Sequence, residues 1–284
     1  MIRFGMHFCL WAPTWTLAAG ETALPEAARY GIQLVEIPLL NPDAIDVPRT
    51  RALFEANGIA PSASLCLPAT AMAHRDPAAA EAFLMRALGV AHALGSSFLG
   101  GVTYSALGYT TGAPPTEAEY DNIAKALRPV ARRAADLGMT LGLEPCNRYE
   151  THLLNNSDQA VSLFERIGEP NLALHLDTYH MNIEEKGFAH AIEIAGDHVP
   201  YIHMSESDRG VPGTGTVNWD QLLAALAKSD LDRDLVIESF ITLPPEIAAA
   251  LCVWRPVANS RYEVLQQGLS FLRARAAAHG LEAG

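Results

Sequence analysis

Four residues whose side chains commonly bind metal ions end four apolar runs in the second half of the chain. The runs are LGLE ending at Glu144, LHLD ending at Asp177, YIH ending at His203 and VIE ending at Glu238. Side chains alternate between the two faces of a β-strand. The aliphatic residue before each of the four therefore lies on the opposite face. The pattern predicts that the four polar side chains point into one common interior.

Three carboxyl groups and an imidazole buried together each cost on the order of several kcal/mol unless an opposite charge compensates them. A divalent cation supplies that charge, and this donor set suits Mn²⁺, Mg²⁺ or Co²⁺ better than structural zinc. Each residue alone has a commoner role, because a strand-end carboxylate usually caps a loop and a lone histidine is usually a hydrogen-bonded core residue. All four residues stand at the end of a predicted strand and on the same, inward face of it. This agreement favours the interpretation as a metal site.

The four runs belong to a longer alternation of β-like and helical segments, which predicts a parallel α/β fold. We expect strands at about residues 2–9, 33–39, 60–67, 96–103, 139–145, 172–178, 199–205 and 234–240. Helical patterns lie between them, for example over Ala78–Leu94 and from the capping box Thr116–Glu119 to just before Gly138. Glycines after the helices supply the left-handed residue that leads into the next strand.

Eight strands and their helices in 284 residues predict a single (β/α)₈ TIM barrel, with one domain over residues 1–284. A doubly wound sheet is the alternative. Neither a G-x-G-x-x-G sequence after the first strand nor a Walker A sequence supports it. The long loop over residues 101–115 is either a lid or an ordinary surface loop.

The composition limits the possible partners. The formal net charge is −12, from 32 acidic and 20 basic residues, which disfavours nucleic acid and anionic membranes as partners. No apolar run is long enough for a membrane span, and the first residues are typical of a strand rather than of a signal peptide. The four cysteines are scattered without a C-x-x-C pair. We therefore expect reduced thiols and a cytoplasmic protein with a small-molecule substrate.

Beyond these patterns, the sequence resembles the sugar isomerase/epimerase superfamily, and within it the ketose 3-epimerases of the D-tagatose, D-psicose and L-ribulose 3-epimerase types. The most specific segments are EPCNRYE at 144–150, LDTYHMNIEE at 176–185, HMSESDRG at 203–210 and ESF at 238–240. The resemblance extends over nearly the whole chain, from Gly5 to Arg255. It implies the same barrel fold that the alternation of elements predicts.

The resemblance implies that Glu144, Asp177, His203 and Glu238 hold one divalent metal ion, most often Mn²⁺, with Co²⁺ or Mg²⁺ as alternatives. It also makes Glu144 and Glu238 the acid and base, one on each face of the sugar carbon. Such an enzyme would invert C3 of a free ketohexose or ketopentose, such as D-tagatose, D-fructose, D-psicose or L-ribulose, through a cis-enediolate. Two carboxylates suit this reaction, because inversion needs a base on one face and an acid on the other.

The resemblance further implies that Glu150, His180 and Arg209 bind the O1, O2 and O3 end of the substrate. From the residues alone, a surface ion pair for Arg209 and a helix-start cap for His180 are the commoner roles. Members of the family are usually homodimers or homotetramers. The segment around Trp254 is a candidate for that contact.

Other functions remain open at this point. The same quartet would serve an aldose–ketose isomerase, a hydroxypyruvate isomerase or an inosose dehydratase of the superfamily. A sugar-binding barrel without catalysis is a further alternative. It would be expected to lack Glu144 or Glu238, and both are present.

Several other residues carry weaker signals. Glu36 stands near the end of the second predicted strand, on the face that points inward. It has either a hydrogen bond to a metal ligand or to Arg209, or a purely structural role. His7 and His175 are expected to be polar packing residues of the barrel. The apolar wall for the far end of a sugar is not assigned, and its candidates are Trp11, Trp15, Trp254, Tyr104, Leu107 and Tyr109.

Overall fold

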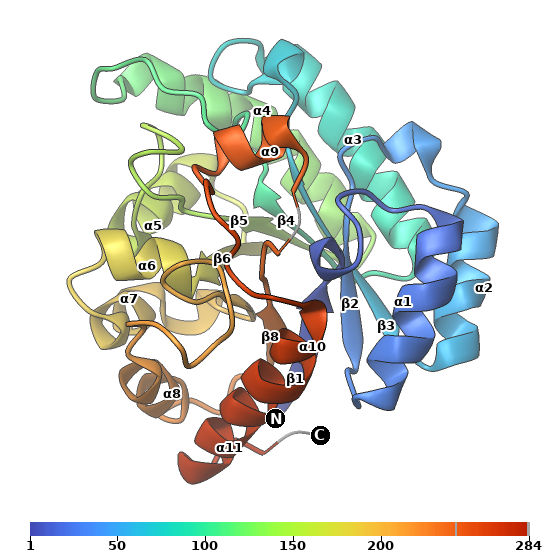
Figure 1. Cartoon of the computed structure of the whole chain (residues 1–284). Coiled ribbons are helices and arrows are strands. Elements are labelled where there is room, and N and C mark those ends of the chain that lie inside the picture. Colours follow the sequence, from blue (N-terminus) through green and yellow to red (C-terminus); the bar gives the residue numbers. More distant parts are fainter. Residues whose placement is uncertain (242, 283–284) are drawn as a thin grey trace.

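The centre of the molecule is a closed barrel of eight parallel strands (Figure 1). The computed structural model describes residues 1–241 and 243–282, except the side chain of Glu246. The strands are β1 (Ile2–His7), β2 (Leu34–Pro38), β3 (Ala60–Cys66), β4 (Phe98–Val102), β5 (Thr140–Leu143), β6 (Leu172–Asp177), β7 (Tyr201–Met204) and β8 (Arg233–Ile237). Each strand pairs with the next, and β8 closes the barrel on β1. The predicted (β/α)₈ barrel is confirmed.

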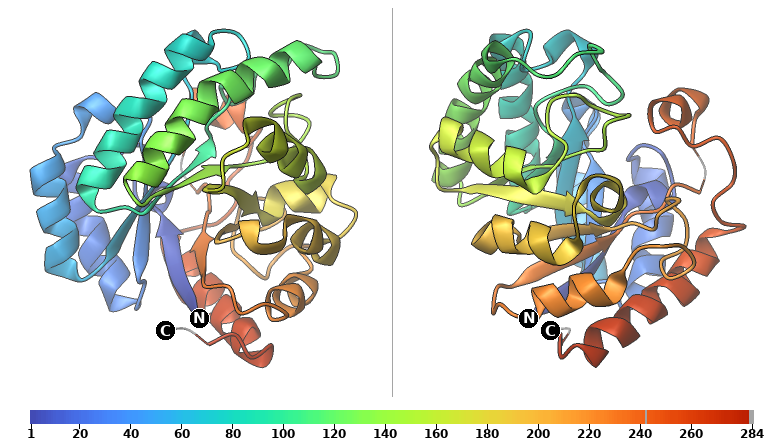
Figure 2. Two further views of the ribbon diagram at one scale, coloured as in Figure 1. Left: turned by 180° about the vertical axis from the view of Figure 1, so that it is seen from behind. Right: turned by 90° about the vertical axis from the view of Figure 1, so that its left-hand side faces the viewer.

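Helices surround the barrel (Figures 1 and 2). They are α1 (Leu17–Arg29), α2 (Val47–Asn57), α3 (Pro77–Leu94), α4 (Glu117–Asp136), α5 (Ser157–Ile167), α6 (Thr178–Glu184), α7 (Phe188–Ala195), α8 (Trp219–Leu226), α9 (Pro245–Ala250), α10 (Arg261–Glu263) and α11 (Leu269–Ala278). The two ends of the chain meet, because the Ile2 amide donates to the Glu282 carbonyl at 3.1 Å. Among the described residues, no helix is both long and apolar enough to cross a membrane.

Local sequence signals fix the helix ends. The Thr116 hydroxyl accepts from the Glu119 amide, and the Glu119 carboxylate accepts from the Thr116 amide, so the predicted capping box is present. Helices α2 and α3 end at Gly58 and Gly95, which adopt the left-handed conformation. These helix ends keep the connections between strands and helices short. The last residues of all strands therefore lie at the same end of the barrel.

The two faces of the strands bury different residues. The outward aliphatic residues, such as Leu143, Leu176 and Ile237, belong to the large core between barrel and helices. A separate small cluster fills the base of the barrel and consists of Leu34, Phe98, Ala173, Tyr201 and Val236. Except for Phe98, its members lie two residues before polar residues such as His203 and Glu238, so they share the inward face with them. The alternation therefore places an apolar floor beneath a polar layer.

Two glycines make room in this interior. A Cβ atom on Gly142 would lie 2.4 Å from the Phe98 ring, and one on Gly100 would lie 2.7 Å from His175 Nδ1. Both approaches are closer than real side chains allow. The absence of a side chain at β4 and β5 thus lets the rings of Phe98 and His175 occupy the barrel interior.

Candidate functional site

The structure brings the four predicted metal ligands together at the carboxyl end of the strands. Asp177 ends β6, His203 lies in β7, and Glu144 and Glu238 directly follow β5 and β8. His203 Nδ1 lies 3.7 Å from a Glu144 oxygen, 3.9 Å from an Asp177 oxygen and 3.5 Å from a Glu238 oxygen. All four side chains are buried. Three carboxyl groups from three strands thus surround one ring nitrogen.

The chemistry of this cluster fits a divalent cation. His203 Nδ1 is buried without a hydrogen-bond partner, although His203 Nε2 lies 2.8 Å from a Glu36 oxygen. Ligand atoms of Glu144, Asp177 and His203 all lie within 4.8 Å of one another, close enough to share one ion. A cation would compensate the buried carboxylates and accept the unpartnered lone pair.

Burial has opposite effects on the two kinds of group in this cluster. It raises the pKa of Glu238 well above the usual range, with the neighbouring Asp177 and Glu144 adding to the rise and His203 and Arg209 opposing it. The pKa of Glu144 is raised by the same burial. Burial lowers the pKa of His203, but the carboxylates of Glu36 and Glu238 outweigh it, and the pKa lies well above its ordinary value. A cation bound here would therefore replace protons.

Arg209 is the cation that the structure itself places in the site. Its Nη1 donates to Asp177 Oδ2 at 3.1 Å and to Glu238 Oε2 at 2.7 Å, and its Nη2 donates to Glu150 Oε1 at 3.2 Å. The guanidinium lies 4.1 Å from the ring centre of Tyr179. The residue is buried, and its backbone φ angle of 64° is rare for a residue other than glycine. The alternative of a surface ion pair is wrong.

His180 and Glu150 lie beside Arg209. His180 Nδ1 accepts from the Asn147 amide at 3.0 Å, and its Nε2 lies 3.2 Å from Arg209 Nη2 and 3.8 Å from Glu144 Oε1. Glu150 Oε1 accepts from the Asn147 side chain at 2.8 Å, while Glu150 Oε2 is buried without a partner. The cap of α6 is Asp177, not His180. Asn147, which our sequence reasoning did not single out, stands in the EPCNRYE segment and holds both neighbours.

A cavity of about 330 Å³ opens onto these residues. Its polar end is lined by His7, Glu144, Glu150, His180, His203, Arg209 and Glu238. The rest of the lining is mostly apolar and includes Leu40, Leu67, Leu107, Phe240, Leu243, Ile247 and Leu251. Such a cavity can bind a small polar molecule at one end and exclude water at the other.

The apolar wall is not made of the tryptophans considered from the sequence. Trp15 stacks on Phe54 in the core, and Trp11 donates to the Glu26 carboxylate. Trp254 is 75% exposed. None of the three lines the cavity.

The loop after β4 and the helix α9 form the wall instead. Leu107 of this loop and Ile247 of α9 both pack against the buried cluster of Cys9, Phe240 and Leu251, while the fully buried Tyr104 donates its hydroxyl to the Glu144 carbonyl. The contribution of α9 was missed. The four-residue spacing of Ile247 and Leu251 is the helical signal that could have indicated it.

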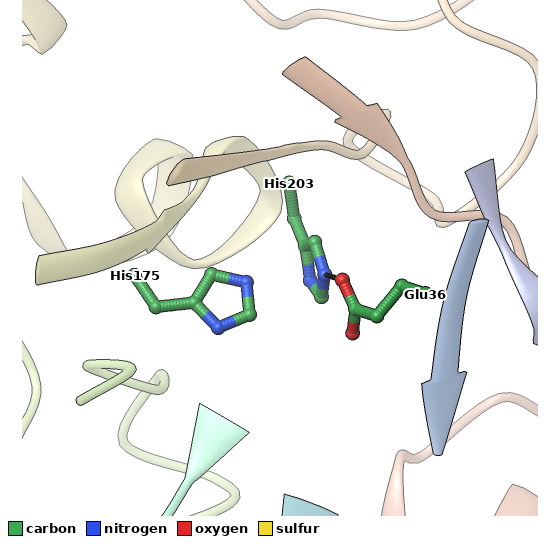
Figure 3. A group of neighbouring side chains, drawn as sticks. All are labelled: Glu36, His175 and His203. Carbon is green, nitrogen blue, oxygen red and sulfur yellow. Dashed lines mark hydrogen bonds and ion pairs between the residues drawn. The ribbon is translucent and has the colours of Figure 1, made fainter. Parts of the chain in front are cut away.

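Glu36, His7 and His175 lie beside the four predicted metal ligands. Glu36 is fully buried and contacts His203, so of its two expected partners the structure shows the predicted ligand, whereas Arg209 binds other groups. Figure 3 shows the Glu36 and His175 side chains extending toward His203 from opposite sides. The pKa of His7 is lowered to about 4, mainly by burial, so this residue is neutral at pH 7.

Comparison with known proteins gives consistent relatives. Residues 24–275 match the family described as xylose isomerase-like TIM barrel. L-ribulose 3-epimerase of Methylomonas sp. strain DH-1 is 38% identical over an alignment of 280 residues, and the match covers 96% of this chain and 98% of that protein. Ketose 3-epimerase of Arthrobacter globiformis is 36% identical over an alignment of 278 residues, with 96% of each chain covered.

Solved structures agree with these relatives. The crystal structure of D-allulose 3-epimerase from Methylomonas sp. in complex with D-allulose matches with a TM-score of 0.92 at 37% identity, covering 96% of this chain and 97% of that chain. D-psicose 3-epimerase with D-tagatose from Clostridium cellulolyticum H10 matches with a TM-score of 0.87 at 25% identity, covering 96% and 99%. The similarity thus extends along the whole barrel.

Proposed function

The chain belongs to the xylose isomerase-like TIM barrel family, among the ketose 3-epimerases, and on this premise we propose that it inverts C3 of free ketoses. The observation that carries the proposal is the pair of buried carboxyl groups of Glu144 and Glu238. They follow different strands, and both face one cavity. Such a pair can serve as base on one face of a bound carbon and as acid on the other.

We propose that Glu144, Asp177, His203 and Glu238 hold one divalent ion, with Mn²⁺ preferred and Co²⁺ or Mg²⁺ as alternatives. The bound ion would act as a Lewis acid that polarises the ketone next to C3. The donor set of three carboxylates and one imidazole supports hard or borderline cations of this kind. His203 contributes Nδ1, because Nε2 is engaged by Glu36.

The two glutamates move the proton. One carboxylate removes the hydrogen from C3, which leaves a cis-enediolate, and the other carboxyl group delivers a proton to C3 from the opposite face. Return of the proton from the first face would only regenerate the substrate. Because the reaction is reversible, the two residues exchange roles between the forward and reverse directions.

Three residues would orient the substrate. The guanidinium of Arg209 is a hydrogen-bond donor at the polar end of the cavity, where it can stabilise charge that develops on the sugar oxygens, and the His180 ring beside it can bind a further oxygen or hydroxyl group. The unpartnered Glu150 Oε2 is an acceptor for a hydroxyl group. Together these groups suit the O1, O2 and O3 end of a ketose.

The deciding experiment is NMR in D₂O with D-tagatose, D-fructose and L-ribulose. Metal-free protein is reconstituted with Mn²⁺, and the ion is then exchanged for Mg²⁺ to limit line broadening. We expect deuterium at C3 together with the C3 epimer. Deuterium at C1 or an aldose product would instead identify an aldose–ketose isomerase, and no exchange with any sugar would refute the proposal.

We further propose a cytoplasmic homodimer or homotetramer. The four cysteines are free in the structure, which suits a reducing compartment. Trp254 is largely exposed and offers an apolar surface for another copy of the chain. Light scattering coupled to size exclusion measures the mass directly, and a monomer would contradict this assembly.

A further inference from the structure

A buried contact across the barrel holds the imidazole of His203. Glu36 Oε2 lies 2.8 Å from His203 Nε2 and accepts from the Tyr201 hydroxyl at 2.6 Å. Tyr201 and His203 are two residues apart in β7, so both point inward. Glu36 lies in β2, which is separated from β7 in the barrel by β1 and β8. The contact therefore spans the interior rather than joining neighbouring strands.

We propose that Glu36 is a positioning residue that fixes His203 in the tautomer whose Nδ1 lone pair faces the metal position. This inference rests on the proposed function, since it concerns how that metal is held. A carboxylate only accepts hydrogen bonds, so the proton of a neutral imidazole must be at Nε2. The other tautomer would place two lone pairs against each other across 2.8 Å. Nδ1 is then left free to face Glu144, Asp177 and Glu238.

A second contact fixes the orientation of the same ring. The His175 ring lies edge-on to the His203 ring (Figure 3). The ring centres are 4.1 Å apart. His175 is itself held, because its Nδ1 accepts from the Gly101 amide at 2.9 Å. With Glu36 on its Nε2 and His175 against its face, the His203 imidazole has little freedom to rotate or flip.

The charge of Glu36 distinguishes this role from a structural one. A neutral amide could accept both hydrogen bonds that reach Glu36 Oε2. The carboxylate is nevertheless fully buried, and in the part of the chain that the structure describes its ion-pair partners are His7 and His203 alone. A buried carboxylate is costly without a lysine or arginine partner. What it adds over an amide is negative charge that raises the basicity of the imidazole and attracts a cation.

Mn²⁺ affinity, measured by calorimetry, tests the inference without an activity assay. We expect Glu36→Gln to weaken Mn²⁺ binding by about tenfold to a hundredfold. Tyr201→Phe removes one hydrogen bond to the carboxylate but leaves its charge, so a smaller loss is expected. The matched control is Glu26→Gln, which neutralises another buried carboxylate, one that binds Trp11 and Arg261 outside the barrel. Its Mn²⁺ affinity should stay within about twofold of the unmodified protein.

An unchanged Mn²⁺ affinity of folded Glu36→Gln would overturn the inference. If this variant does not fold, nitrogen-15 NMR of the histidine rings in the unmodified, Mg²⁺-loaded protein decides instead. We expect His203 to carry its proton on Nε2, and a proton on Nδ1 would overturn the inference. An unmodified protein that binds no divalent cation would refute the proposed function itself. Cation binding together with an unaffected Glu36→Gln refutes only the role of Glu36.

Discussion

At the scale of single residues, Glu144 and Glu238 are alike in burial but differ in their neighbours. Glu238 accepts a short hydrogen bond from Arg209, at 2.7 Å, whereas a Glu144 oxygen lies 3.7 Å from His203 and 3.8 Å from His180. Glu238 is therefore held in a fixed direction by a permanent cation. Glu144 depends on the two histidines, and in the proposed enzyme on the metal.

Glu238→Gln tests the acid and base pair. An amide cannot take up or release the proton, so kcat should fall by about 10²- to 10⁴-fold while sugar binding is partly retained. The assay uses saturating Mn²⁺, so that weaker metal binding does not cause the loss. Glu165→Gln, on the exposed side of α5, is the control and should keep full activity. Full activity of Glu238→Gln would refute the mechanism with two carboxylates.

At the scale of elements, the two faces of each strand have different roles: one packs against the helices and the other faces the barrel interior. Leu174 and Leu176 of β6 pack outward into the helix layer, while His175 and Asp177 point inward. The helices contribute mainly stability, and the loops after the strands contribute the cavity. The loop after β4 meets α9, since a Cβ atom on Gly108 would lie 3.3 Å from the Ala250 carbonyl oxygen. This contact closes the apolar side of the cavity.

A substitution at the start of helix α4 should change the stability of the protein without changing its activity. Thr116→Ala removes the hydroxyl that caps the Glu119 amide, and it should lower the free energy of unfolding by about 1 kcal/mol. No residue of α4 lines the cavity, so kcat should not change. Urea denaturation measures the loss, and Thr116→Ser, which keeps the hydroxyl, is the control. A loss of kcat in the folded variant would show that α4 influences the site.

At the scale of the whole molecule, a small part of the acidity is concentrated inside the barrel. The chain carries a formal charge of −12, and carboxyl groups from β2, β5, β6 and β8 meet inside the barrel. Only the folded chain holds these groups together. The energy of cation binding is therefore added to the energy of folding.

Metal binding should be visible as stability. At an Mn²⁺ concentration of about 100 times Kd, the folded state gains about 2.7 kcal/mol, and the melting temperature should rise by several degrees. A chelator should reverse the rise. Asp177→Asn, which weakens the donor set, should show a smaller rise or none. Identical melting curves with and without Mn²⁺ would contradict the metal site.

The sequence by itself determined the barrel and the set of residues at its carboxyl end. Both follow from short-range patterns: strand alternation decides which side of β5 to β8 is inward, and caps such as Thr116 and Gly95 mark the element ends. The proposed ligands could be named because each one stands at the end of its own strand. The motif segments added Glu150, His180 and Arg209.

Only the tertiary structure decided the contacts between elements that are distant in the chain. Glu36 reaches His203 across the barrel, Arg209 is buried between Asp177 and Glu238, and α9 rather than a tryptophan supplies the apolar wall. These contacts depend on how eight strands close and how the loops above them pack. Closure brings together residues whose separation in sequence carries no periodic signal, and so no local pattern predicts which of them will touch.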